Sequence, residues 1–256
     1  MMRKEHKTRR IHEDVSREEL YGGIVHYQPR RGTKVGTDTL LLVSFVKVQV
    51  GRPALELGAG TGLATLLLGK AGMYPAVGIE IQPQLVEMAR KSAQASKIPE
   101  ARFVHGDIRE HQVKPAFRHF AVIIANPPYY RLGEGLISPL TSRALSRHEI
   151  ASSLADYIVF GEKHLAPDGE LDMILHTSRF GEAMALAQSV GLVSERIAEI
   201  HPKPKTPAKH VLVSFCYPER WQGEPQRHHV VLHMYDGSPS CALAALEARL
   251  ICPQLF

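Results

Sequence analysis

The sequence predicts an α/β fold in which a mostly parallel sheet of seven strands is doubly wound, with helices on both faces. Short apolar segments alternate with longer amphipathic ones from residue 53 onward, as strands and helices do in such folds. The segment 120–125 is apolar throughout, which is typical of a parallel strand buried on both faces. A glycine-rich loop at 58–62 joins one apolar segment to the next helix. In such a sheet, ligands bind at the carboxyl ends of the strands.

The chain is expected to divide into a basic N-terminal arm, residues 1–20, and a single domain, residues 21–256, with an extension after about residue 218. Residues 3–10 are charged or polar throughout, so we interpret the arm as a disordered, solvated tail or as a segment that contacts a polyanion, and favour the tail. The start of the domain predicts a short strand or hairpin at 21–28 and a short buried helix at 40–48.

After residue 53, strands and helices are expected to alternate regularly along the chain. Pro83 suits the first turn of a helix, and Leu85, Met88 and Ala89 have helical spacing. The turn Pro167-Asp168-Gly169 separates a helix from the next strand. We expect helices at 62–71, 83–97, 152–164 and 180–190, strands at 53–57, 76–80, 101–105, 120–125, 170–175, 193–199 and 211–217, and then a further strand at 229–235 and a helix at 243–250.

The loop after the first of these strands reads Glu56-Leu57-Gly58-Ala59-Gly60-Thr61-Gly62. Its glycines let the backbone turn sharply and approach a ligand closely. A dinucleotide fingerprint would place its third glycine at residue 63, where this chain has Leu63. The observed Gly-x-Gly-x-Gly spacing is instead that of loops that hold S-adenosylmethionine, so we expect a Rossmann-like methyltransferase sheet with Glu56, Gly58, Gly60 and Gly62 at the cofactor.

Two acids stand at the ends of the next two strands. Glu80 closes the strand at 76–80, where a carboxylate can accept hydrogen bonds from two ribose hydroxyls. Asp107 follows the strand at 101–105, where it can accept from an adenine amino group or flank the ring. Either acid alone would more often be a solvated loop residue, but the succession of loop, acid and acid favours a cofactor site.

The strand at 120–125 delivers the tetrapeptide Asn126-Pro127-Pro128-Tyr129. An adenine N6 or a carboxamide nitrogen is a poor nucleophile because its lone pair is delocalised. The Asn126 side-chain oxygen and the Pro127 carbonyl can accept from both of its N–H bonds and localise that lone pair. Tyr129 can stack on a planar target, and Tyr130 is expected to line the same pocket. We therefore assign Asn126, Pro127 and Tyr129 to catalysis and expect neither a catalytic histidine nor a metal.

The sequence resembles the bacterial tRNA-valine (adenine-N6) methyltransferase family over roughly residues 21–217. The features that carry the resemblance are Gly36-Thr37-Asp38, the loop 56–62, Glu80, Asp107, residues 126–130 and Arg147-His148-Glu149.

This resemblance implies methylation of the adenine beside the anticodon of a valine tRNA. It also implies that Thr37 and Asp38 lie at the methionine moiety of the cofactor, with Lys34 nearby. From the residues alone, Thr37-Asp38 would be a helix N-cap, and both roles are compatible. The long basic arm and the extension after Tyr217 depart from the family pattern. The extension either adapts the protein to another RNA or covers a sheet edge.

The charge of the chain favours a polyanionic partner. Lys and Arg number 31 against 26 Asp and Glu, a formal net charge of +5. We expect Arg131, Arg143, Arg147 and His148 to form a substrate loop. Lys203, Lys205 and Lys209 lie in a proline-rich loop that either contacts phosphates or is simply solvated. The basic N-terminus lacks the apolar stretch that a signal peptide needs, and no apolar run reaches membrane length, so a cytoplasmic protein with no membrane partner is expected. We expect RNA, with tRNA favoured, as the partner; the sequence leaves the oligomeric state open, with a monomer favoured.

Three alternatives remain open at this point. A ribosomal RNA adenine would present the same N6 atom as a tRNA adenine. A glutamine amide in a release factor presents a similar planar N–H pair, but such enzymes carry a helical domain before the cofactor loop, and here only about fifty residues precede Gly58. The chain could also be a non-catalytic RNA-binding protein that retains the fold. The intact loop and the intact Asn126 motif argue against this last class.

Overall fold

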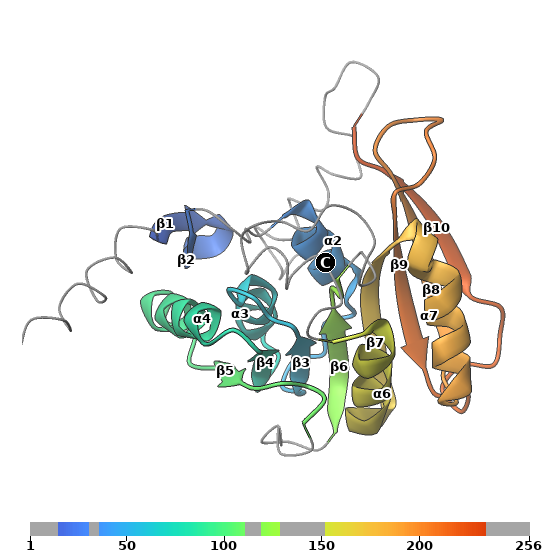
Figure 1. Cartoon of the computed structure of the whole chain (residues 1–256), viewed down its shortest axis with the longest axis horizontal. Helices are drawn as coiled ribbons and strands as arrows, with labels where there is room; N and C mark the ends of the chain where they lie inside the picture. Colours follow the sequence, from blue (N-terminus) through green and yellow to red (C-terminus); the bar gives the residue numbers. More distant parts are fainter. Residues whose placement is uncertain (1–14, 31–35, 111–118, 129–151, 234–256) are drawn as a thin grey trace, which may run out of the picture.

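The computed structural model describes residues 15–30, 36–110, 119–128 and 152–233. Their centre is one sheet with the strand order β10-β8-β9-β7-β6-β3-β4-β5 (Figure 1). All neighbouring strands are parallel except at β9, which runs antiparallel to both β7 and β8. The strands are β3 (Ala54–Leu57), β4 (Ala76–Glu80), β5 (Ala101–His105), β6 (Phe120–Ala125), β7 (Leu165–His176), β8 (Val193–His201), β9 (His210–Cys216) and β10 (Gln226–Val231).

The predicted doubly wound α/β fold is confirmed, with one strand more than the seven expected. The additional strand is β10, which comes from the C-terminal extension and pairs with β8 at the edge of the sheet. It occupies 226–231 rather than the predicted 229–235. The extension therefore does cover a sheet edge, and the helix expected at 243–250 lies outside the described residues.

Helices cover both faces of the sheet (Figure 1). On one face lie α2 (Thr37–Phe45), α3 (Leu63–Lys70) and α4 (Pro83–Ala95); on the other lie α6 (Leu154–His164) and α7 (Thr177–Ser189). The two faces take alternate residues of each strand. In β6, Val122 and Ile124 belong to the first core, whereas Ile123 and Ala125 belong to the second. All four are fully buried, as the apolar run predicts.

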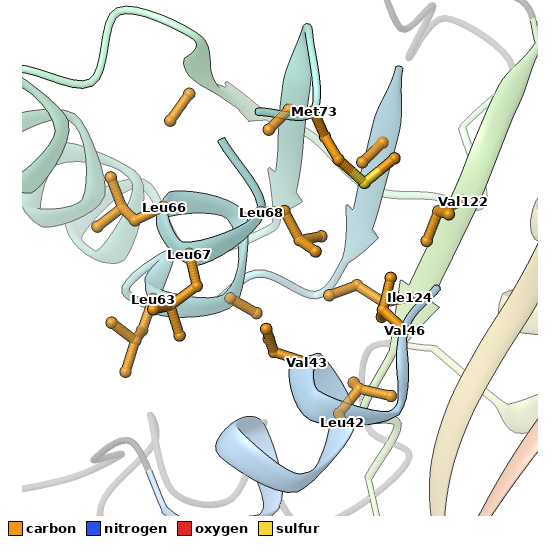
Figure 2. Close-up of a cluster of buried hydrophobic side chains, with 14 of the residues drawn as sticks. Leu42, Val43, Val46, Leu63, Leu66, Leu67, Leu68, Met73, Val122 and Ile124 are labelled. Atoms are coloured by element: carbon orange, nitrogen blue, oxygen red, sulfur yellow. The ribbon is translucent and has the colours of Figure 1, made fainter. Parts of the chain in front are cut away.

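The core beneath α2 and α3 fixes these helices over the middle of the sheet. Figure 2 shows Val43 and Val46 from the α2 segment in one cluster with Leu68 of α3 and Ile124 of β6, and Leu42 beside Val43. These side chains are at most 8% exposed. Because α2 packs here, its first turn stands near the carboxyl ends of the central strands.

A hairpin packs outside this layer. Strand β1 (Val15–Leu20) pairs antiparallel with β2 (Ile24–Pro29) through the short 3-10 turn η1 (Tyr21–Gly23). Strand β1 thus lies within the predicted arm, residues 1–20, but belongs to the hairpin, so the hairpin starts before the predicted domain boundary at residue 21. The backbone N–H groups of Val25 and Tyr27 donate to the hydroxyls of Ser96 and Ser92, each at 2.9 Å, which attaches β2 to α4.

Two further boundaries differ from the sequence prediction. Helix α2 begins at Thr37 rather than residue 40 and ends at Phe45. Strand β7 begins at Leu165 and includes the predicted turn at residues 167–169 as a bulge. The register shows this, since Phe120 pairs with Leu165 and Val122 with Glu170.

A buried ionic cluster joins β7 to β8. Glu170 and Asp172 are fully buried, and Arg196 lies 3.1 Å from the first and 3.4 Å from the second. Arg220 contacts Glu170 at 3.0 Å, and the N–H of Lys47 donates to the same carboxylate. Burial and the neighbouring Glu170 raise the pKa of Asp172 well above its ordinary value. The cluster links α2 to the antiparallel half of the sheet.

Within the described part of the chain, no helix combines the length and apolar character that crossing a bilayer requires.

Candidate active site

The order of the strands reverses between β3 and β6, and the candidate site lies at that point. From β3 the chain adds β4 and β5 in one direction, and from β6 it adds β7 in the other. In open α/β sheets this reversal leaves a crevice at the carboxyl ends of the strands. Leu57 pairs with Ala125 at the ends of β3 and β6. The next residues along the chain, Gly58 and Asn126, therefore start the two loops side by side.

The glycine loop requires glycine for its conformation and its packing. Gly58, Gly60 and Gly62 have φ values of 70°, 55° and 80°, in the left-handed region that L side chains rarely adopt. A Cβ on Gly62 would collide with the ring of Phe103, and one on Gly58 would lie 2.9 Å from Tyr157 Oη. Among the residues that the structure describes, a Cβ on Gly60 would meet nothing within 4 Å. The backbone of Gly60 therefore faces open space that a ligand can approach.

Glu80 holds this loop from the end of β4. The residue is 6% exposed. Its Oε2 accepts from the N–H of Gly60 at 2.9 Å, and its Oε1 accepts from the N–H of Gln82 at 2.9 Å. The carboxylate thus lies at the centre of the loop, beside the open space at Gly60.

Glu56 lies deeper and binds the first turn of α3. Its Oε2 accepts from the N–H of Thr65 at 2.9 Å and from the Thr65 hydroxyl at 2.5 Å. Burial raises the pKa of Glu56 to about 7, and the hydrogen bonds from Thr65 oppose that rise only in part. Through these contacts Glu56 fixes the first turn of α3, the helix that follows the loop.

Replacing Glu56 with Gln is expected to flatten the pH dependence of stability. The folded-state pKa of about 7 lies above the ordinary value of 4.5, so the native chain keeps a proton that the unfolded chain has released between these values. The free energy of unfolding of the wild type should therefore fall as the pH rises through this window. Gln cannot titrate, so the variant should lack this fall. Thermal unfolding from about pH 4.5 to about pH 8 checks this, with the exposed Glu87→Gln as control; parallel curves for wild type and Glu56→Gln would contradict it.

Asp107 lies just beyond β5 and is held by Arg109. The Nε of Arg109 donates to both carboxylate oxygens at 3.0 Å, and the backbone N–H of Arg109 adds a bond of 2.9 Å to Oδ1. The Arg109 guanidinium holds the pKa of Asp107 below its ordinary value. The acid is thus ionised and fixed in position at the same edge as Glu80. Arg109 was not among the predicted site residues, although its place two residues after Asp107 was a local signal.

His26 is a second residue at the loop that was not predicted from the sequence. It is fully buried in β2, and its Nε2 lies 3.0 Å from Oγ1 of Thr61 in the glycine loop. Burial lowers its pKa, so the ring is neutral near pH 7. Among the described residues, no hydrogen-bond partner is found for its Nδ1. The hairpin thereby supports the loop from outside the sheet. No local pattern indicates this, because the two residues are 35 positions apart.

The first turn of α2 places Asp38 near the carboxyl end of β7. Gly36, not Thr37 or Asp38, is the N-cap, and it has no side chain with which to cap the helix. The N-cap interpretation of Thr37-Asp38 is therefore wrong, since both residues lie inside the helix. Asp38 Oδ1 lies 4.0 Å from Nδ1 of His210, which starts β9. Burial lowers the pKa of His210.

The segment that the sequence predicts to be catalytic is described as far as Pro128. Asn126 is half-buried directly after β6, while Pro127 and Pro128 are buried, so this backbone is fixed at the crevice. Seven of the predicted site residues lie outside the described residues: Lys34, Tyr129, Tyr130, Arg131, Arg143, Arg147 and His148.

The predicted lysine loop occupies residues 202–209, between β8 and β9. Lys203, Lys205 and Lys209 are all exposed. The Thr206 hydroxyl donates to the carbonyl of Lys203 at 2.7 Å, and Lys205 has a φ of 57°, so the loop is a tight turn. Because β9 and β8 are two and three strand spacings from β6, the loop that joins them lies about 9–15 Å across the sheet from Asn126, at the same edge.

Comparisons with known proteins agree with this geometry. A family model described as a methyltransferase domain matches residues 54–133. A tRNA1(Val) (adenine(37)-N6)-methyltransferase of Porphyromonas gingivalis is 30% identical over 187 residues, which are 70% of this chain and 72% of that protein. An enzyme of the same name from Aeromonas hydrophila is 27% identical over 82% of this chain and 87% of its own. The crystal structure of a predicted O-methyltransferase from Agrobacterium tumefaciens has the same fold, with a TM-score of 0.61 at 20% identity, over 82% of this chain and 95% of that one.

Proposed function

Because this chain belongs to the tRNA1(Val) (adenine(37)-N6)-methyltransferase family, we propose that it methylates N6 of the adenine beside the anticodon of a valine tRNA. The chain is an S-adenosylmethionine-dependent methyltransferase. The observation that carries the proposal is the register of β3 with β6, which starts the glycine loop and the Asn126 segment side by side. A cofactor bound at the glycine loop would therefore lie next to a planar nitrogen bound at the Asn126 segment.

The residues present fit S-adenosylmethionine. Gly60 borders open space, which allows a ligand to approach the loop backbone. Glu80 accepts from two backbone N–H groups and, at 3.3 Å, from the side-chain amide of Gln82. A carboxylate has about four acceptor positions, so one is open to a ribose hydroxyl, and a second opens when the Gln82 amide gives way to the other hydroxyl. We assign the adenine end of the cofactor to Asp107. The methionine end is assigned to Thr37 and Asp38, with Lys34 nearby.

Bound S-adenosylmethionine supplies an electrophilic methyl group on a positively charged sulfur. The protein's part is to present the target nitrogen in line with that carbon. We propose that the side-chain oxygen of Asn126 and the carbonyl of Pro127 accept the two N6–H bonds, which localises the lone pair on nitrogen. The buried prolines hold both acceptors in place, and orientation of this kind is worth effective molarities of about 10⁵–10⁸ M. Tyr129 is assigned to stacking on the base.

An RNA substrate accounts for the lysine loop. Lys203, Lys205 and Lys209 are exposed on the sheet edge that carries Asn126, within reach of phosphates on a strand that delivers a flipped-out adenine. We assign Arg131, Arg143, Arg147 and His148 to the same substrate strand, on the other side of Tyr129 and Tyr130 in the sequence.

Replacing Lys203, Lys205 and Lys209 together with Ala is expected to raise the KM for tRNA while leaving kcat and the affinity for S-adenosylhomocysteine nearly unchanged. If each lysine contacts one phosphate, the slope of log KM against log salt concentration should fall by about 2. The control is Lys97→Ala with Lys163→Ala, which removes two exposed lysines at the opposite edge of the sheet and should leave KM and slope unchanged. An unchanged KM and slope in the triple variant would mean that the loop is only solvated.

The proposal is tested with unmodified transcripts of a valine tRNA and purified full-length enzyme. The wild-type transcript should yield N6-methyladenosine, and a transcript with guanine in place of the adenine beside the anticodon should yield none. Equal methylation of both transcripts would overturn the assigned position. N6-methylation of another tRNA alone would preserve the chemistry and overturn the isoacceptor.

A further inference from the structure

Three potential metal ligands lie on one face of the sheet at the β8–β10 edge. Glu199 and His201 are two residues apart in β8, so their side chains project from the same face. In the parallel register, His229 of β10 pairs directly with Glu199 and therefore shares that face. Ile197, on the same face of β8, belongs to the core beneath α6 and α7. The three ligands thus extend the α7 side of the sheet at its outer edge.

Their spacing suits a small divalent cation. Oε2 of Glu199 lies 3.2 Å from Nδ1 of His229 and 3.7 Å from Nε2 of His201. All three ligand atoms lie within 4.8 Å of one another. In a tetrahedral zinc site with bonds of about 2.0–2.1 Å, ligand atoms are about 3.3 Å apart. The ligand atoms, up to 4.8 Å apart, must move closer to reach this spacing, and the side chain of His229, which is 68% exposed, has room to rotate.

The hydrogen bonding of His201 prepares it as a ligand. Its Nδ1 lies 2.7 Å from the carbonyl oxygen of Thr206. A carbonyl only accepts, so Nδ1 must carry the proton, and in the neutral ring the lone pair is on Nε2, which faces Glu199. Metal-bound histidines are commonly oriented by a bond of this kind to a backbone carbonyl.

Strand β10 has little apolar packing to hold it. Its first four residues are exposed, while Val230 and the following Leu232 pack against the core. An edge strand with so small an apolar face gains little from burial. A metal ion shared between β8 and β10 would join the two strands through side chains in addition to the backbone ladder.

We propose that Glu199, His201 and His229 bind a divalent first-row transition-metal ion, for which Zn²⁺ is the probe. Imidazole ligands favour Zn²⁺, Ni²⁺ or Co²⁺ over Mg²⁺ and Ca²⁺. The site ties the strand of the C-terminal extension to the sheet and, through His201 and Thr206, fixes the base of the lysine loop. It is separated from the ends of β3 and β6 by β7 and β9, so its role is structural and not catalytic.

Isothermal titration of metal-free, untagged full-length protein with Zn²⁺ tests the site. The wild type should bind about one ion per chain, and Zn²⁺ should raise its melting temperature. His229→Ala and Glu199→Gln should each weaken binding at least about tenfold and abolish the shift in melting temperature. The matched control is His228→Ala, an exposed neighbour in β10 that projects from the opposite face. Circular dichroism of each variant without metal establishes that it is folded.

Two results would overturn the proposal. One is unchanged affinity and an unchanged melting-temperature shift in both His229→Ala and Glu199→Gln. The other is an equal loss in His228→Ala, which would show binding by other members of the chain's 14 histidines. Since His229 is exposed, its replacement removes little packing, and Glu199→Gln gives an independent measurement with the carboxylate charge removed.

Discussion

Replacing Asn126 with Ala is expected to reduce methyl transfer by at least about 10²–10³-fold, the cost typical of losing one group positioned at the reacting atoms. Asn126 directly follows β6 and is only half-buried, so the truncation should leave the fold intact. Because the side chain is assigned to the target nitrogen, the affinity for S-adenosylhomocysteine should stay close to that of the wild type. Steady-state kinetics with tRNA and calorimetry with S-adenosylhomocysteine measure the two effects separately.

A second variant, Asn126→Asp, tests whether the side-chain oxygen is the group that matters. Asp retains a side-chain oxygen that can accept from the target N–H, whereas Ala retains none. Activity should therefore be higher in Asn126→Asp than in Asn126→Ala. If Asn126→Ala kept most of its activity, or if both variants lost cofactor affinity to the same degree as turnover, the acceptor role would be wrong.

Replacing Glu80 with Ala is expected to weaken S-adenosylhomocysteine binding by about 10²–10⁴-fold. Each hydrogen bond to a charged group is worth about 1.5–3 kcal/mol, and two ribose hydroxyls are assigned to this carboxylate. The variant also loses the acceptor for the N–H groups of Gly60 and Gln82, so the glycine loop should be less well ordered. Calorimetric titration with S-adenosylhomocysteine measures the effect.

Glu87→Ala is the matched control for Glu80→Ala. Glu87 lies in α4 with a side chain that is 67% exposed, and its replacement changes the net charge by the same amount. Its affinity for S-adenosylhomocysteine should equal that of the wild type. A Glu80→Ala protein that binds the ligand as tightly as Glu87→Ala would exclude the ribose role.

The parts of the fold that local patterns specify were predictable from the sequence. The run at 120–125 predicted β6 with its bounds, because a strand covered on both faces needs apolar residues at every position. The glycine spacing likewise predicted a sharp loop, and its three glycines have positive φ. Glu80 ends β4 and Asp107 follows β5 as expected, so the position of each was predictable, although their roles stay predictions.

Contacts between distant segments were not predictable in this way. Glu170 and Asp172 alternate along β7, a pattern that ordinarily indicates a solvent-facing side. They are instead fully buried because Arg196, more than twenty residues away, supplies the opposing charge. The contact of His26 with Thr61 likewise joins distant segments, because tertiary packing places the hairpin against the glycine loop. The charge and polarity of a residue predict its usual exposure to solvent, but they do not predict which distant residue it will contact.

Substrate class is the central claim, and transfer from labelled S-adenosylmethionine to three substrates tests it most directly. Total tRNA, total ribosomal RNA and purified release factor are incubated separately with the enzyme, and the products are digested and identified. The account predicts label in tRNA as N6-methyladenosine and none above background in the other two. Label in ribosomal RNA alone would contradict it, because the substrate would then be another RNA. Label in the release factor alone would also contradict it, because the methylated nitrogen would then belong to a glutamine amide and not to a base.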